Sequence, residues 1–186
     1  MQHHYAKDEY RVYQDSRSGK PAAQQWLYAA YYSMVVAVCL RYIDTRSDAE
    51  EVVADSFIRF FDAVKDSFRY QGEGSLKAYL KKITVNQALM FLRKQRLVFE
   101  EVDEQHEQLA DIDLDALDQL AAKDILKAVQ QLPAGYRTVF NMYVIEGYTH
   151  AEIADALQIA EATSKTQLMK AKLQLQKILT RYERYV

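Results

Sequence analysis

Residues 149–179 read THAEIADALQIAEATSKTQLMKAKLQLQKIL, and this stretch decides the fold of the C-terminal part of the chain. Thr149 and Glu152 stand at the spacing of a capping box, in which two side chains satisfy backbone amides at the start of a helix. We expect that helix to end near Leu157 and to be followed by a turn at residues 158–160, with Ile159 as the plug between two helices. A longer helix then begins at Glu161.

The longer helix is predicted to have two faces of different character. Its inner stripe recurs at helical spacing and consists of Ser164, Leu168, Ala171, Leu175 and Ile178. Its outer face is basic and rich in small residues, namely Ala162, Lys165, Thr166, Met169 and Lys170. A short helix, a tight turn and a longer helix of this kind are typical of a helix-turn-helix, whose second helix enters the major groove of DNA. An ordinary helical hairpin is the alternative, and the capping box or the lysines alone would not exclude it.

The distribution of charge supports a nucleic-acid partner more than the net charge does. The 186 residues carry a net charge of −2, but residues 1–99 carry +4, residues 100–118 carry −9 with no basic residue, and residues 119–186 carry +3. Two basic blocks are therefore separated by one acidic segment. That segment is at least a solvated linker, and it also has the charge of a mimic that occupies a channel built for nucleic acid.

The composition predicts an all-α protein of the reducing cytoplasm. With 5 Gly and 2 Pro the chain has few helix breakers, and its single cysteine, Cys39, excludes an internal disulfide framework. No stretch approaches the ~20 apolar residues of a membrane span, so neither export nor membrane insertion is expected. We find no motif for a phosphate-binding loop, a zinc site or a catalytic triad, and we therefore expect no enzyme activity, no cofactor and no metal.

In the N-terminal half we expect residues 1–20 to be a loose terminus and helices to follow over residues 21–42, 47–64 and 76–97. Ser47 and Glu50 have capping-box spacing at the start of the second of these helices. Its first turns are unusually acidic, which either complements the helix dipole or forms a surface for a partner.

The glycine-bearing loop at residues 68–75 mixes aromatic, basic and amide side chains. Such side chains stack on and hydrogen-bond an unpaired base, although a plain connector is equally consistent with them. The helix after it is predicted to bury Leu76, Leu80, Ile83 and Met90. It presents basic residues interleaved with Tyr79, Asn86 and Gln87, which suits a groove for a nucleic-acid backbone.

Beyond the acidic segment we expect one helix that stops at Pro133 and another over residues 134–146, carrying Val139, Phe140, Tyr143 and Val144, with Gly147 at its end. With the helix-turn-helix they would make a C-terminal bundle of about four helices. The predicted domains are residues 20–99 and 119–186, joined by the acidic linker at residues 100–118.

In this order and spacing, the segments of both halves resemble the extracytoplasmic-function (ECF) branch of the bacterial sigma factors, the promoter-recognition subunits of RNA polymerase. The resemblance rests on DAEEVV at residues 48–53, FIRFF at 57–61, GSLKAYL at 74–80, ITVN at 83–86 and LRK at 92–94. In the second half it rests on LP at 132–133, YRTVF at 136–140, EGYT at 146–149, EIA at 152–154 and TSKTQL at 163–168. Gln158 stands in the turn where Gly is common in this family.

The resemblance implies a role for each predicted surface. The acidic helix would dock on the clamp helices of the largest polymerase subunit through Asp48, Glu50, Glu51, Asp55 and Arg59. The glycine loop and the next helix would hold and open the minus-ten promoter element through Arg69, Gln71, Lys77, Tyr79, Lys81, Lys82, Asn86, Gln87 and Arg93. The last helix would read the minus-thirty-five element through Glu161, Thr163, Lys165, Thr166, Met169, Lys170 and Lys172.

The resemblance also implies the partners: core RNA polymerase, including the flap of its second subunit, promoter DNA and an anti-sigma factor. The acidic linker would thread the polymerase cleft. Two other functions are compatible with the predicted helices. One is a free-standing helix-turn-helix regulator with an N-terminal sensor or dimerisation bundle, and the other is a helical adaptor that binds only protein.

Overall fold

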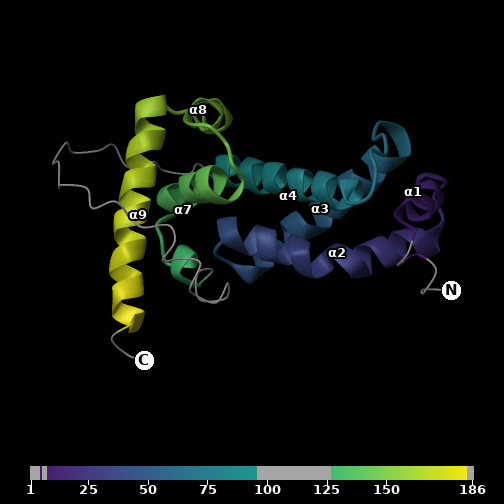
Figure 1. Ribbon diagram of the computed structural model, residues 1–186, viewed down its shortest axis with the longest axis horizontal. Coiled ribbons are helices and arrows are strands. Elements are labelled where there is room, and N and C mark those ends of the chain that lie inside the picture. Colours follow the sequence, from purple (N-terminus) through teal and green to yellow (C-terminus); the bar gives the residue numbers. More distant parts are fainter. Residues whose placement is uncertain (1–4, 6–7, 96–126, 184–186) are drawn as a thin grey trace. The chain divides into compact units, whose positions relative to one another are not determined.

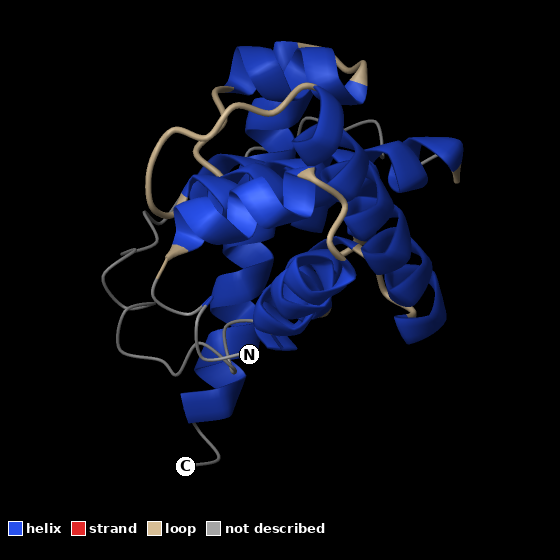
Figure 2. Ribbon diagram, turned by 90° about the vertical axis from the view of Figure 1, so that its right-hand side faces the viewer, coloured by secondary structure: helices blue, strands red, loops and turns tan. Residues whose placement is uncertain are grey.

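The computed structural model describes residue 5, residues 8–95 and residues 127–183, the last three without their side chains. Every regular element in these ranges is helical, as the uniform helix colour of Figure 2 shows. The chain divides into two compact units, residues 1–91 and 92–186, with the division near the end of the fourth helix. The predicted all-α fold is confirmed, whereas the predicted acidic linker lies outside the described residues.

The first unit is built on two long helices, α2 (Pro21–Tyr42) and α3 (Arg46–Asp66), which pack along each other (Figure 1). Pro21 opens α2, where its missing amide hydrogen costs no hydrogen bond. Leu27, Val35 and Phe60 are fully buried and form the apolar core with the buried Cys39. Burial raises the pKa of the Cys39 thiol to about 12, so it remains an uncharged core residue.

The start of α3 differs from the prediction by two residues. Thr45, not Ser47, is the N-cap, and its hydroxyl oxygen accepts the backbone amide of Asp48 at 3.2 Å. Glu50, which would have completed a capping box with Ser47, instead pairs with the Nε of Arg46 at 3.0 Å. Both threonine and serine have suitable spacing, so local sequence alone does not decide between the two caps.

Helix α4 (Ser75–Lys94) follows the glycine loop. Its periodicity predicts the burial of some of its side chains correctly and that of others wrongly. Leu76 and Leu80 are buried as predicted, but Met90 is 47 % exposed, so the prediction that it is a core residue is wrong. Gln87, predicted to be presented outward, is buried instead. In a helix with apolar residues on more than one side, the neighbouring helices decide which side is covered.

The prediction of a loose N-terminus is wrong for residues 9–17, which form the helix α1 (Glu9–Arg17). Its N-cap is Asp8, whose carboxylate accepts the backbone amide of Arg11 at 2.9 Å. Val12 and Ser16 are buried because α1 packs on α2 and α3. Figure 1 shows α1 beside the end at which α2 begins.

The second unit contains α7 (Ala134–Phe140), the π-helical turn η2 (Asn141–Ile145), α8 (His150–Leu157) and α9 (Glu161–Glu183). Residues 127–130 are helical, and this helical stretch ends before Pro133 as predicted. The helix expected over residues 134–146 widens at Asn141, whose carbonyl accepts the amide of Glu146 at 3.0 Å. This wide turn buries Asn141 and Met142 and leaves Tyr143 40 % exposed, against the α-helical expectation.

Candidate nucleic-acid interface

The helix-turn-helix is formed by α8 and α9, and its local geometry follows the sequence prediction. The Thr149 hydroxyl oxygen accepts the amide of Glu152 at 3.2 Å, and Glu152 Oε2 accepts the amide of Thr149 at 2.8 Å. The turn is made by Gln158 in the left-handed conformation, with φ of 56°. A non-glycine residue rarely adopts this conformation, so Gln158 places the two helices at some conformational cost.

The two faces of α9 are largely those expected. Ser164, Leu168, Ala171 and Leu175 are buried, and Gln167, which the periodic pattern did not assign to the core, is fully buried beside them. On the outer face Ala162, Glu161 and Lys165 are exposed, whereas Thr163, Thr166, Met169, Lys170 and Lys172 are half-buried. Ile159, the predicted plug of the turn, is also only half-buried.

Glu161 and Lys165 form an ion pair along the outer face, with Lys165 Nζ at 2.8 Å from Glu161 Oε1. The hydrogen bond from Lys165 holds the pKa of the Glu161 carboxyl below its ordinary value. Both side chains are at least half exposed, and an exposed pair of this kind contributes little to stability. Lys165 can therefore exchange this carboxylate for a phosphate at low cost.

His150, at the start of α8, connects the two helices. Its Nδ1 lies 2.9 Å from the Ser164 hydroxyl on α9, and its ring stacks on Tyr143 at 4.5 Å between centroids. Burial, reinforced by the charge of Lys165, lowers the pKa of His150 below its ordinary value of 6.5, although Glu161 acts in the opposite direction. The neutral imidazole is thus the form that belongs to the folded helix-turn-helix.

We expect the second unit to lose stability as pH falls below about 6.5. Because the folded pKa of His150 is depressed, the unfolded chain binds the proton more readily, and the loss grows until pH passes the folded pKa. Thermal unfolding between pH 8 and 5 checks this, with His150→Phe as the comparison, since Phe keeps the stacking on Tyr143 and does not titrate. An identical pH dependence in both proteins would contradict the assignment.

A second basic face lies on α4. Lys82, Asn86 and Arg93 are exposed and recur at helical spacing, and the exposed Met90 lies in the same row. Lys77, in the first turn of the helix, is also exposed, and Lys81 is half-buried. The sequence signal that could have placed Met90 here is its spacing of four residues from Asn86.

Other predicted minus-ten residues are held by the protein itself. The ring of Tyr79 is half-buried and lies 4.7 Å from Phe68 and 6.4 Å from Phe60 between centroids. The Gln87 amide nitrogen lies 3.8 Å from the Met90 sulfur, so Gln87 supports the face from inside.

In the glycine loop, Arg69 and Gln71 are exposed. The Arg69 guanidinium donates to the carbonyls of Ser67 and Phe68 at 3.4 and 3.3 Å. The backbone amide of Gln71 donates to the Ser75 hydroxyl at 3.4 Å, and the Gln71 side chain takes no part in this bond. Both side chains therefore lie on the solvent side of the loop.

The acidic start of α3 is a surface, not part of the core. Glu50, Glu51, Asp55 and Arg59 are exposed and Asp48 is half-buried. Ile58 lies among them and is 59 % exposed, although its apolar side chain gives no sign of this in the sequence. An exposed apolar side chain of this kind would lose contact with water if a partner covered the surface.

Comparison with known proteins places both units in one family. Residues 27–98 match Sigma-70 region 2, and residues 122–175 match Sigma-70 region 4, so the two matches together cover more than half of the chain. The chain is similar to the ECF RNA polymerase sigma-E factor of Haemophilus influenzae, with 24 % identity over 84 % of this chain and 87 % of that protein. It is also similar to the ECF RNA polymerase sigma factor SigE of Mycolicibacterium smegmatis, with 25 % identity over 90 % of this chain and 66 % of that protein.

Among solved structures, the sigma factor RpoE of Bartonella quintana, determined with the anti-sigma factor NepR, is similar at 21 % identity and a TM-score of 0.47, over 84 % of this chain and 96 % of that one. None of the described helices is both long and apolar enough to cross a membrane. The two matched regions occur in the order that the sequence predicts. The chain therefore belongs to the extracytoplasmic-function type of sigma-70 factors, which direct the initiation of transcription by RNA polymerase.

Proposed function

We propose that this sigma factor uses three separate helical faces: α3 for core polymerase, α4 with its glycine loop for the minus-ten element, and the outer face of α9 for the minus-thirty-five element. The observation that carries the proposal is a basic helix face in each matched region, with Lys82 and Arg93 exposed on α4 and Lys165 exposed beside the half-buried Lys170 on α9. Sigma factors are initiation factors and not enzymes, which agrees with the expectation of no catalytic activity. A protein that works with polymerase on the chromosome acts in the cytoplasm.

The face proposed for polymerase combines charge with one apolar anchor. Glu51, Asp55 and Arg59 are exposed around Ile58 on α3, while Val52 and Val53 are turned into the core. Charged residues at the rim of such a surface steer the encounter, and the central apolar residue gains most from losing water. An anti-sigma factor that covered this face would keep the protein from polymerase.

The face proposed for the minus-ten element suits a strand whose bases have left the duplex. Lys82 and Arg93 supply positive charge for the phosphates, and Asn86 offers an amide for a base edge. Met90, exposed between them, adds an apolar contact for an unstacked base. We propose Met90 as a member of this face in addition to the residues predicted from the sequence.

The face proposed for the minus-thirty-five element has the shape that the major groove requires. Ala162 and Thr166 have small side chains, so the outer side of α9 can approach the floor of the groove closely. Lys165 and Lys170 add charge for phosphates or guanine edges. Stability comes from the opposite side, where Ser164, Leu168 and Ala171 are buried. The acidic linker, proposed to thread the polymerase cleft, lies outside the described residues.

Gel-shift experiments with core polymerase present and absent test this function. The protein should select promoter fragments from a genomic pool only with core polymerase. Selection of a site by the protein alone would favour a free-standing regulator, and failure to form either complex would favour an adaptor that binds other proteins.

Asn86→Ala should leave core binding unchanged and impair strand opening at the selected promoter by about tenfold, because one amide contact to an open base is lost. Permanganate reactivity of unpaired thymines measures opening directly. Normal opening by Asn86→Ala would remove Asn86 from the minus-ten face.

A further inference from the structure

Helix α1 precedes the residues that match Sigma-70 region 2, yet it contacts the loop that follows α3. From these contacts we infer that α1 is a positioning element: Glu9 and Tyr13 hold the glycine loop at residues 68–75 in the shape that the minus-ten element needs. The inference rests on the proposed function of that loop. It adds a segment to the promoter-opening apparatus that the family match does not cover.

Glu9 caps α4 from a distance in sequence. Its Oε2 accepts the backbone amide of Gly74 at 2.7 Å and its Oε1 accepts that of Leu76 at 3.1 Å, across 65 and 67 residues. The first amides of a helix have no acceptor within the helix, and a carboxylate is well matched to their positive end. A local cap would orient only α4, whereas this one ties the loop and the start of α4 to α1.

Tyr13 holds the other end of the loop. Its hydroxyl donates to the carbonyl of Phe68 at 3.3 Å, and its ring stacks on Tyr70 with 5.5 Å between centroids. The ring of Tyr10 approaches Tyr70 from the same helix at 5.3 Å. Arg17, one turn further along α1, donates to the Tyr13 hydroxyl at 3.3 Å. The loop is thus fastened by α1 both where it begins and where it ends.

The loop needs these contacts with α1 because its glycines allow its backbone to adopt many conformations. Gly72 and Gly74 have φ of +108° and +85°, which L-residues with side chains rarely adopt. A Cβ at either position would meet no other atom within 4 Å, so these glycines serve backbone conformation and not close packing. Glycine adopts many conformations, and contacts from outside the loop must select one of them.

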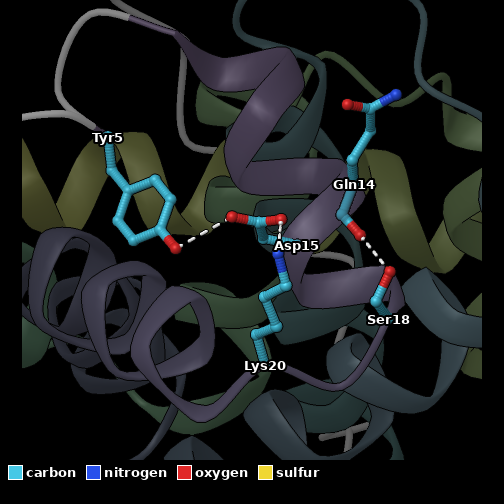
Figure 3. Close-up of polar contacts among 5 residues, drawn as sticks. All are labelled: Tyr5, Gln14, Asp15, Ser18 and Lys20. Atoms are coloured by element: carbon cyan, nitrogen blue, oxygen red, sulfur yellow. Dashed lines mark hydrogen bonds and ion pairs between the residues drawn. The ribbon is translucent and has the colours of Figure 1, made fainter.

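Helix α1 is itself anchored firmly enough to act as a support. The carboxylate of Asp15 receives Lys20 Nζ at 2.6 Å and the Tyr5 hydroxyl at 3.0 Å, and Figure 3 shows both side chains directed at it. The hydrogen bond from Lys20 holds the pKa of Asp15 below its ordinary value. Val12, which lies one turn before Asp15 on the same helix, is fully buried. These contacts hold the backbone of α1 in place beside the loop, within reach of the Glu9 side chain.

The test compares Glu9→Gln and Tyr13→Phe with the wild-type chain. Gln keeps the size of the side chain but offers one acceptor oxygen, and Phe keeps the ring without the hydroxyl. Asp66→Asn, at the exposed end of α3, is the control for loss of one negative charge. Amide hydrogen exchange of Gly74 and Leu76 in the full chain measures how well Glu9 protects these two amides. Core binding and permanganate reactivity at the selected promoter measure function.

We expect the amides of Gly74 and Leu76 to exchange at least about tenfold faster in Glu9→Gln, because one charge-assisted acceptor is lost. Promoter opening should fall about fivefold to tenfold in both variants while core binding stays within twofold of wild type. The control should match wild type in all three measurements.

Two results would overturn the inference. One is unchanged amide exchange in Glu9→Gln, and the other is faster exchange with normal promoter opening in both variants. Failure of the proposed function is distinguishable, since then the wild-type protein itself would form no complex with core polymerase. The positioning role would fall with it, although the amide exchange would still show whether Glu9 holds the amides of Gly74 and Leu76.

Discussion

Replacing Arg137 by Met should lower the free energy of unfolding of the second unit by about 2–4 kcal/mol. Arg137 is 1 % exposed, and its Nη1 donates to the carbonyls of Gln130 at 3.0 Å and Leu132 at 3.5 Å. Gln130 is the last described helical residue before Pro133 and Leu132 follows it, so Arg137 supplies a donor at the place where the helix ends. Met fills the aliphatic volume of Arg137 but removes this donor from a buried bond to Leu132 and a part-buried bond to Gln130.

Thermal or denaturant unfolding of the full chain measures this loss as a shift of the transition that belongs to the second unit. Lys177→Met on the exposed side of α9 is the matched control and should change stability by less than about 0.5 kcal/mol. Arg137→Lys should give an intermediate loss, since a single ammonium does not reproduce the planar fork of a guanidinium. A transition of Arg137→Met that coincides with wild type would show that the two carbonyls are satisfied without Arg137.

Replacing Lys165 and Lys170 together by Ala should weaken binding of the polymerase complex to promoter DNA by roughly tenfold to a hundredfold at moderate salt. Each lysine that contacts a phosphate releases about one counterion, so the slope of log affinity against log salt should become less steep by about 2. Lys165 first gives up its exposed pair with Glu161, which is worth little in water.

Titrations of labelled promoter at several salt concentrations measure both quantities. Core binding should persist in the double variant, because the proposed docking face lies on α3. Lys65→Ala, which removes an exposed positive charge from the last turn of α3, should leave the salt slope unchanged. If the double variant loses core affinity as strongly as promoter affinity, the outer face of α9 is a protein interface and its assignment to DNA is wrong.

The features that the sequence by itself determined are those whose causes are local. The capping box of Thr149 and Glu152 involves residues three positions apart, and the buried stripe from Ser164 to Leu175 repeats with the helical period. Pro21 and Pro133 mark helix boundaries because of their own covalent geometry. Backbone chemistry and helical spacing hold wherever the segment is placed, so these features could be predicted without the rest of the fold.

Tertiary structure decided which of several equivalent local solutions is used. Helical spacing suggests that Met90 is buried and Gln87 exposed, but the structure has the reverse. The packing of the rest of the first unit decides which side of α4 is covered. The π-helical turn after Phe140 adds one residue to that turn, and a pattern based on 3.6 residues misplaces the side chains within it, such as Met142 and Tyr143.

The contact that the sequence shows least is the pair of hydrogen bonds from the backbone amides of Gly74 and Leu76 to the Glu9 carboxylate. No spacing rule connects residues 65 positions apart, and Glu9 by itself looks like an ordinary acidic residue in the first turn of a helix. Only the packing of α1 on α2 and α3 brings its carboxylate to the free amides of α4. Hydrogen-bonding capacity is encoded locally, but the partner that satisfies it is chosen by the folded chain.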